Sequence, residues 1–125
     1  MRTSELTGPA LDWAVATCEG KGIEFDDLKD PWLTLDGIAY QPLHSYTPST
    51  DWAQGGPIVE REKIGFRFSG GFGFCAWKSY GVGPHQNEHS QYGPTPLIAA
   101  MRCYVASELG DEIELPDELL QGEQT

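Results

Sequence analysis

The sequence predicts an α+β fold in which an antiparallel β-sheet, made of two hairpins, packs with about three α-helices. Three observations support this prediction. The chain has 125 residues, of which 39% are hydrophobic, so it is long enough to bury a core of its own. Two segments alternate apolar and polar residues on either side of turn residues, as the strands of a hairpin do. Three other segments carry the start and stop signals of helices.

The first helix is expected at about residues 9–19. Thr7 or Gly8 can cap it, Pro9 suits its first turn, and Gly20 can end it. The polar stretch IEFDDLKD that comes next is expected to be a linker. Four apolar residues of the helix follow helical spacing and place one stripe against the core: Leu11, Ala14, Val15 and Cys18.

Residues 32–41 are expected to form the first hairpin. Asp36 and Gly37 are a favoured pair for a type I′ turn, in which both central residues need positive φ. Pro42 cannot donate a hydrogen bond to a neighbouring strand, so it limits or ends the second strand.

Residues 64–80 are expected to form the second hairpin of the same sheet. Ile64, Phe66 and Phe68 alternate with glycine and arginine, which is the period of a strand. Ser69-Gly70-Gly71 then turns the chain. The next stretch, GVGPHQNEHSQYGP, is expected to be a loop because of its composition.

The second helix is expected at about residues 51–63, after a row of three residues that can cap it. It is expected in two pieces, because Gly55-Gly56-Pro57 interrupts the pattern and Pro57 suits a second helix start. The third helix is expected at about residues 95–109, where Thr95 can cap it and Gly110 can end it. We expect one domain over residues 1–110, followed by an acidic tail over residues 111–125.

The net charge of −11 is unevenly distributed along the chain. Residues 1–36 contain eight acidic and three basic residues, and residues 37–107 contain four and five. Residues 108–125 contain seven acidic residues and no basic one. Direct binding of duplex DNA is not expected, because it needs clustered lysine and arginine. The acidic ends favour a solubilising surface, or a face that competes for a basic nucleic-acid-binding partner.

The composition indicates neither a membrane span nor a disulfide framework. No apolar run approaches the roughly 20 residues that a bilayer requires, and the three cysteines include no C-x-x-C pair. We therefore expect a soluble protein of a reducing cytoplasm, with free cysteines, no structural zinc and no membrane contact.

One predicted loop contains a pattern known from metalloproteases. Residues His85 to His89 match H-x-x-E-H, in which both histidines bind zinc from one face of a helix. Pro84 and Gly93-Pro94 leave too few residues between them for such a helix. The preferred interpretation is a polar surface loop or a lid over a ligand. The alternative is a metal-dependent hydrolase that uses His85, Glu88 and His89. No catalytic residue, cofactor or metal ligand is predicted.

The strongest candidate for a binding site is the pair of helix starts at Ser49-Thr50 and Thr95-Pro96. If the two starts converge, their free N–H groups and helix dipoles would hold an anion. Arginine side chains would add positive charge, and tryptophan side chains would stack on a ring. The alternative is that these residues are ordinary caps and core aromatics. The predicted ligand-binding residues are Ser49, Thr50, Asp51, Trp52, Arg61, Trp77, Thr95 and Arg102.

Three stretches resemble the NinX-like family of small bacteriophage proteins: SELTGPALDWAVATCEG, YTPSTDWAQGGPIVEREKI and GPTPLIAAMRCYVASELGDEIELP. The resemblance covers most of the chain, and the last two motifs are specific. More loosely, an S-T-D helix start, a hairpin with tryptophan and a T-P-L helix, in that order, are similar to phage alpha-beta-alpha sandwich domains. The resemblance implies a phage protein that is made in a bacterial host and has an α+β fold. It transfers no catalytic residue.

We therefore expect a bacteriophage accessory protein that binds a ligand and does not catalyse a reaction. The ligand would be small, anionic and nucleotide-derived, and sequestering a host immune signal would be one use of such binding. The alternative is an acidic inhibitor of a basic host or phage enzyme that acts on nucleic acid. Either protein would work in the cytoplasm of the bacterial host. Four tryptophans in 125 residues also leave open a homo-oligomer.

Overall fold

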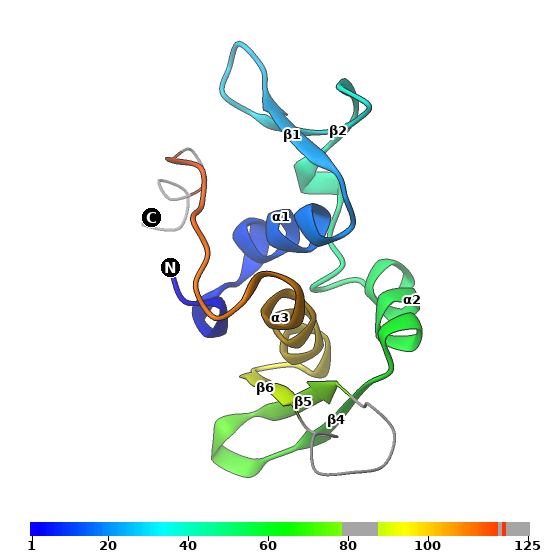
Figure 1. Ribbon diagram of the computed structural model, residues 1–125, viewed down its shortest axis with the longest axis vertical. Coiled ribbons are helices and arrows are strands. Elements are labelled where there is room, and N and C mark those ends of the chain that lie inside the picture. The colour runs from blue at the N-terminus through cyan, green and yellow to red at the C-terminus, as the bar shows by residue number, and fades with distance from the viewer. Residues whose placement is uncertain (79–87, 118, 120–125) are drawn as a thin grey trace.

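The computed structural model describes residues 1–78, 88–117 and 119, and it confirms the predicted α+β class (Figure 1). Within these residues it contains three α-helices: α1 (Gly8–Cys18), α2 (Trp52–Glu62) and α3 (Pro96–Leu109). Two antiparallel sheets have the strand orders β1-β2-β3 and β4-β5-β6. Their strands are β1 (Gly22–Phe25), β2 (Pro31–Leu35), β3 (Ile38–Pro42), β4 (Ile64–Phe68), β5 (Phe74–Lys78) and β6 (Glu88–Gly93). Three short 3-10 helices are η1 (Thr3–Glu5), η2 (Leu43–Ser45) and η3 (Gly70–Phe72).

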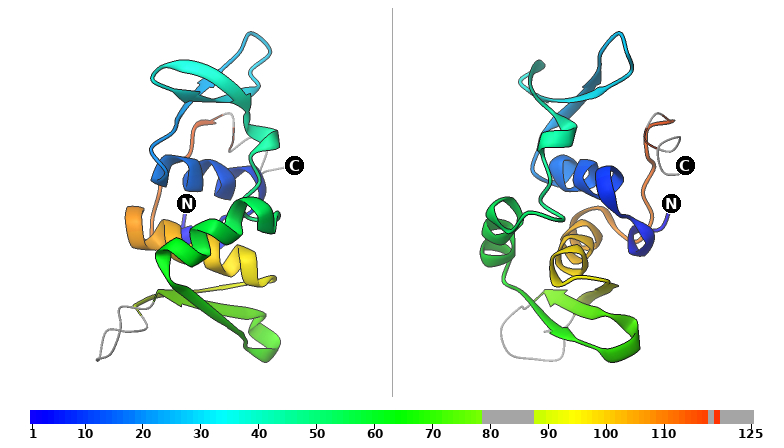
Figure 2. Two further views of the ribbon diagram at one scale, coloured as in Figure 1. Left: turned by 90° about the vertical axis from the view of Figure 1, so that its right-hand side faces the viewer. Right: turned by 180° about the vertical axis from the view of Figure 1, so that it is seen from behind.

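The helices lie between the two sheets, which form opposite ends of the molecule (Figures 1 and 2). α1 lies next to the β1–β3 sheet, α3 packs on the β4–β6 sheet, and α2 lies beside α3. Both predicted hairpins are present, but the expectation that they share one sheet was wrong, because they belong to two separate sheets. The helical layer presents two opposite sides, and each hairpin covers one of them with its apolar face.

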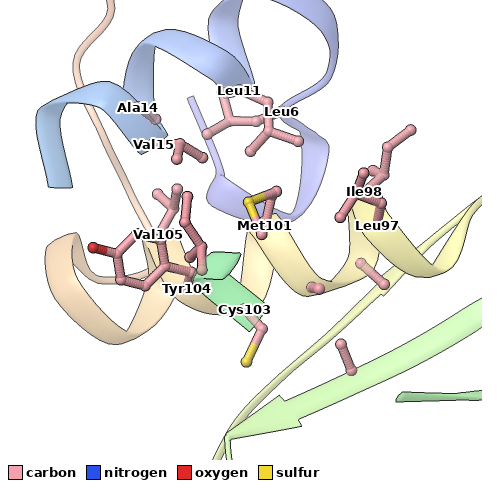
Figure 3. Packing of buried hydrophobic residues seen from close by; sticks show 14 of the residues in the cluster. Leu6, Leu11, Ala14, Val15, Leu97, Ile98, Met101, Cys103, Tyr104 and Val105 are labelled. Atoms are coloured by element: carbon pink, nitrogen blue, oxygen red, sulfur yellow. The ribbon is translucent and has the colours of Figure 1, made fainter. Parts of the chain in front are cut away.

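The core is built around α3, in which nine of 14 residues are buried (Figure 3). Leu11 and Val15 of α1 face this helix, and Leu6 lies above Met101 in the same view. On the sheet side, a Cβ added to Gly93 would lie 2.7 Å from the backbone nitrogen of Ala99. A glycine and an alanine therefore let β6 approach the helix backbone closely.

The first sheet confirms the predicted type I′ turn. Asp36 and Gly37 both have positive φ, of 54° and 81°, as this turn requires, and the flanking Leu35 and Ile38 pair with each other. The sheet also contains a strand where a linker was expected, because β1 pairs with β2. The four residues of β1 are too short a stretch for its alternating burial to be recognised from sequence.

Helix α2 is continuous, so the prediction of two separate pieces was wrong. Pro57 is the sixth residue of the helix and removes only the hydrogen bond to the carbonyl of Ala53. Because Ala53 is exposed, water can replace that bond. Gly55 is buried, and a Cβ added to it would lie 2.2 Å from the carbonyl oxygen of Pro48. The glycine that was predicted to break the helix therefore lets α2 pack against the preceding segment.

The second sheet is larger than predicted. β4 and β5 form the expected hairpin, in which Phe66 pairs with Ala76. Residues 88–93 were expected to be part of a loop but form β6, which pairs with β5. Glycine and polar residues dominate this strand, so its sequence lacks the apolar alternation by which a strand is recognised.

Ile113, Leu115 and Leu119, which follow α3, pack against the two hydrophobic clusters of the core. Ile113 donates a backbone hydrogen bond of 3.0 Å to the carbonyl of Met1, and Leu115 is buried in the main cluster. Leu119 is buried in a second cluster with Ala16, Leu33 and Leu43, which joins α1 to the β1–β3 sheet. The predicted acidic tail thus begins with a segment that is packed on the domain.

The free cysteines agree with the prediction from the sequence. Cys18, Cys75 and Cys103 are free thiols, and the last two are buried. Burial raises the pKa of the Cys103 thiol to about 12. In the described part of the chain, no helix is both long enough and apolar enough to cross a bilayer.

Gly55 provides a test of the packing of α2. We expect Gly55→Ala to lower the free energy of unfolding by about 1–3 kcal/mol, because its methyl group would overlap the backbone of Pro48. Gly56→Ala is the matched control. Its Cβ would meet only Trp52, at 3.8 Å, so the better helix propensity of alanine should raise stability by up to about 1 kcal/mol. Urea unfolding measures both changes, and equal stability of the two variants would contradict the packing.

Candidate functional site

The first predicted anion site, at the start of α2, is closed by side chains of its own segment. Asp51 is the N-cap, and its carboxylate accepts a hydrogen bond of 3.0 Å from the backbone N–H of Ala53. The side-chain amide of Gln54 donates to Thr47 Oγ1 at 3.1 Å and to Asp51 Oδ2 at 3.0 Å. An anion at this helix start would therefore have to compete with the carboxylate of Asp51.

Ser49 is fully buried and holds this segment against α1. Its backbone N–H donates a hydrogen bond of 2.9 Å to Asp12 Oδ1, a carboxylate from the middle of α1. Burial raises the pKa of the Asp12 carboxyl, and the hydrogen-bonding groups of Ser49 oppose that shift. The hydroxyl of Ser49 is also buried and lacks an aligned hydrogen-bond partner among the described residues. Ser49 therefore connects the segment before α2 to α1 and has a structural role.

The second predicted helix start is capped in the same way. Thr95 Oγ1 accepts a hydrogen bond of 3.1 Å from the backbone N–H of Ile98, which confirms the predicted cap. The two helix starts do converge, since a Cβ added to Gly55 would lie 2.7 Å from Leu97 in the first turn of α3. Apolar packing fills the space between them.

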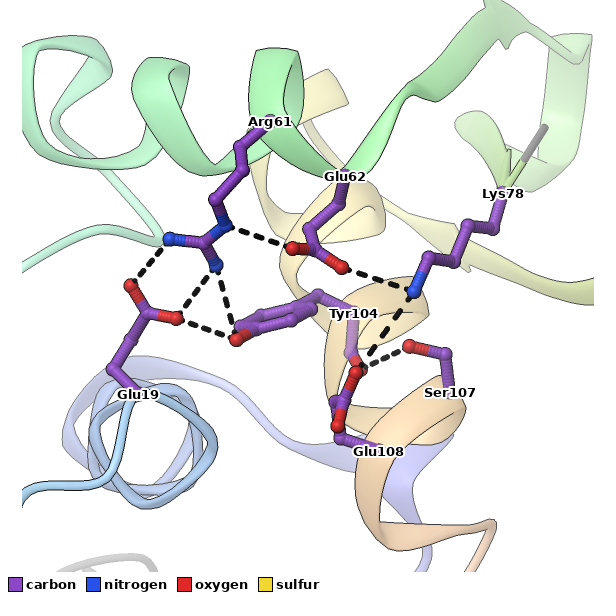
Figure 4. Close-up of polar contacts among 7 residues, drawn as sticks. All are labelled: Glu19, Arg61, Glu62, Lys78, Tyr104, Ser107 and Glu108. Carbon is purple, nitrogen blue, oxygen red and sulfur yellow. Dashed lines mark hydrogen bonds and ion pairs between the residues drawn. The ribbon is translucent and has the colours of Figure 1, made fainter. Parts of the chain in front are cut away.

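Arg61 belongs to a network of ion pairs that joins three helices and β5 (Figure 4). Its guanidinium donates two hydrogen bonds to Glu19, of 2.9 and 2.6 Å, and a third of 2.8 Å to Glu62. Tyr104 donates its hydroxyl proton to Glu19, and Lys78 lies 2.9 Å from Glu62. The hydrogen bonds from Arg61 lower the pKa of the Glu19 carboxyl. The charge of Arg61 is thus balanced within the fold.

A different arginine lies in the wall of an open hollow. This hollow, of about 560 Å³, lies between the η3 turn, β6 and α3, and we call it the Arg102 hollow. Arg102 donates one hydrogen bond to the carbonyl of Leu6 and one to the carbonyl of Tyr92, both of 2.7 Å. Among the described residues no carboxylate pairs with Arg102, and burial lowers its pKa. Other residues that line the hollow are Ser4, Phe72, Ser90, Gln91 and Tyr92.

A second hollow of about 260 Å³ lies beside the first on the β4–β6 sheet, and we call it the Trp77 hollow. Its lining includes Arg67, Trp77 and Tyr92. The indole of Trp77 packs over Gly65 of β4. A Cβ added to Gly65 would lie 2.8 Å from the ring, so a glycine is needed there. The two hollows share Ser90 and Tyr92, so they adjoin along β6.

The eight predicted ligand-binding residues therefore lie in different places. Trp77 and Arg102 line the two adjoining hollows. Thr50 and Trp52 are exposed near the start of α2, and Trp52 packs its ring 5.9 Å from that of Phe66. Sequence reasoning did not include Phe72 or Ser4 in the site. A signal for Phe72 was its place directly after the predicted turn Ser69-Gly70-Gly71, at the end of the hairpin, where a large apolar residue is poorly covered by the strands.

The histidine pattern lies mostly outside the described residues. His85 belongs to residues 79–87, which the structure does not describe, and the backbone of Glu88 and His89 is in β6. Among the described residues, no group of three histidine, cysteine, aspartate or glutamate side chains is arranged to bind a metal. A metal-dependent hydrolase that uses His85, Glu88 and His89 stays a prediction.

Comparison with known protein families relates the chain to a family of bacteriophage proteins. A family described as Bacteriophage P22, NinX matches residues 2–108 of the chain. This range contains both hollows, all three helices up to Glu108, and every predicted ligand-binding residue. No curated protein matches the chain.

The Glu19–Arg61 pair predicts a pH dependence of stability. Because the folded pKa of Glu19 is lowered, the pair stabilises the fold above the unfolded pKa of about 4.5 and loses this effect as the pH falls through the folded value. Between pH 6 and pH 3, we expect wild type to lose on the order of 1 kcal/mol more stability than Glu19→Gln.

Thermal unfolding at a series of pH values measures this difference. Glu60→Gln is the matched control, because Glu60 lies next to Arg61 but is exposed and forms no ion pair among the described residues. Its pH profile should follow that of wild type. Parallel profiles of wild type and Glu19→Gln would show that the pair does not stabilise the fold.

Proposed function

The chain belongs to the bacteriophage P22 NinX family, and from this premise we propose that it binds a small anionic, ring-bearing ligand in the Arg102 hollow. It is a phage accessory protein, and in this proposal it acts by binding, without catalysis. A nucleotide has the required chemistry, with a phosphate for the arginine and a base for the aromatic rings. Sequestering a nucleotide-derived host signal in the host cytoplasm would counter a host defence.

The observation that carries the proposal is the incomplete charge balance of Arg102. A partly buried guanidinium has lost part of its hydration and is usually paired with a carboxylate. Here two backbone carbonyls, of Leu6 and Tyr92, accept from Nε and Nη1. These bonds fix the orientation of the guanidinium without neutralising its charge. An anionic group in the hollow would supply the missing negative charge through charge-assisted hydrogen bonds.

The other walls of the hollow suit a ring. Phe72 and Tyr92 are 77% and 50% exposed, and their ring centroids are 5.8 Å apart. Exposed aromatic rings of this kind provide stacking surfaces for a base. None of the described residues that line the hollow is acidic, although Asp111 and Glu112 line a neighbouring hollow that shares Ser4, Ser90 and Gln91 with it. Arg102 is the charged side chain among the described lining residues, so the field inside the hollow can favour an anion although the net charge of the protein is −11.

An acidic inhibitor of a basic enzyme is the second candidate, and the β1–β3 sheet favours it. This sheet stands at one end of the molecule, away from the main core (Figure 1). Leu35 and Ile38 at its turn are 59% and 71% exposed. Asp36 lies between them in the turn, and the opposite end of the same sheet carries four further acidic residues: Glu24, Asp26, Asp27 and Asp30. A basic partner would bind this surface with an affinity that falls steeply with salt.

Arg102 provides the direct test of the proposed function. We expect thymidine monophosphate to bind the wild-type protein in isothermal titration calorimetry, and inorganic phosphate to bind more weakly because it lacks a ring. Arg102→Gln should weaken binding of thymidine monophosphate about ten- to a hundredfold, since it removes hydrogen bonds to a charged group.

Two controls separate binding from folding. Arg102→Lys keeps the positive charge and should retain part of the affinity, and the melting temperature of each variant reports whether α3 is still packed. Arg61→Gln is the matched arginine outside the hollow and should bind thymidine monophosphate as wild type does. Equal binding by Arg102→Gln and wild type, or no binding by wild type, would refute the proposal.

A further inference from the structure

The Trp77 hollow lies on one face of the β4–β6 sheet, and the Arg102 hollow adjoins it at the edge formed by β6, where Arg102 of α3 is part of its wall. Ile64 and Ala76 belong to the main core, and Gly93 packs against α3, so their strand neighbours point to the opposite side. Those neighbours form a cross-strand row, in which Arg67 pairs with Cys75 and Cys75 pairs with Tyr92. Trp77 pairs with Gly65 in the next row. We call this side the outer face of the sheet.

Aromatic rings follow one another along this face. The indole of Trp77 lies across Gly65, Tyr92 lines both hollows, and Phe72 lies next to Tyr92 at the far end. Each of these rings is at least partly accessible to solvent. A sheet face with a series of accessible rings is a surface on which successive bases can stack.

Positive charge lies on this face and at its β6 edge. Arg67 lines the Trp77 hollow and Arg102 lines the Arg102 hollow. None of the described residues that line either hollow is acidic. Asp111 and Glu112 lie nearby, in a hollow that shares Ser4, Ser90 and Gln91 with the Arg102 hollow. The outer face therefore combines rings with positive charge in a protein that is otherwise strongly acidic.

We propose that the outer face of the β4–β6 sheet binds a short single strand of nucleic acid. The inference rests on the proposed function and extends it, because the Arg102 hollow would hold one nucleotide of a strand that continues over Tyr92 to Trp77. The rings stack with the bases, and the two arginines bind phosphates. Duplex DNA does not fit this chemistry, because its bases are already stacked and two arginines release few counterions. An acidic peptide offers no base to the rings.

The experiment compares a thymidine hexanucleotide with thymidine monophosphate. Fluorescence anisotropy of the labelled hexanucleotide and calorimetry of the monophosphate give the two affinities for the full chain. We expect the hexanucleotide to bind at least about tenfold more tightly, since base stacking on a further ring contributes this much. Trp77→Ala should weaken binding of the hexanucleotide about tenfold and leave binding of the monophosphate unchanged.

Two further variants control for misfolding and for indirect effects of the Trp77 substitution. Arg67 is exposed, so Arg67→Gln should fold, weaken binding of the hexanucleotide, and reduce the dependence of log affinity on log salt by about 0.7. Trp52→Ala is the matched control, because Trp52 is a 50% exposed tryptophan that lines neither hollow. It should leave both affinities unchanged.

The outcomes distinguish this inference from the proposed function. If the monophosphate and the hexanucleotide bind equally, a single-nucleotide site remains and the strand is refuted. If neither binds, both proposals fail. Equal binding of a glutamate hexapeptide would show that the face binds acidic peptides, and equal binding of a duplex would show charge attraction alone. Either result would overturn the inference.

Discussion

The structure depends on the burial of α3. This helix is apolar over most of its surface, so other elements must cover it on several sides. α1 and α2 cover two of these sides, and the β4–β6 sheet covers a third. A sheet that uses one face for the core must turn alternate side chains the other way. The position of Arg67, Trp77 and Tyr92 on an open face is therefore a consequence of how α3 is packed.

The sequence was sufficient to predict those elements whose conformation depends only on residues close by in the chain. The Asp36-Gly37 turn and the cap at Thr95 were predicted because each depends on neighbours within a few residues. The continuity of α2 could not be predicted in this way. A glycine in a helix is unfavourable locally, and at Gly55 it is required only because Pro48 and Leu97 lie so close. The strands β1 and β6 likewise depend on partners that their own composition does not indicate.

The candidate site shows the same limit of local reasoning. Ser49 was predicted to bind a ligand, but its backbone N–H donates to Asp12, 37 residues away, and no local signal in the sequence indicates that partner. Trp77 and Arg102 were among the predicted residues because of their chemistry. Their grouping with Phe72 and Tyr92 arises from strand pairing and from the contact of β6 with α3, which sequence spacing does not reveal.

The packing of Leu119 has a consequence for how this protein is made. Leu119 fills the small cluster between Ala16, Leu33 and Leu43, residues that leave the ribosome long before it does. Until Leu119 leaves the ribosome, the apolar face of the β1–β3 sheet and part of α1 remain exposed to water. Folding during synthesis can therefore form the early hairpin but cannot close its core, and the nascent chain presents an apolar surface that chaperones recognise. This late segment completes a structure that was begun near the other end of the chain.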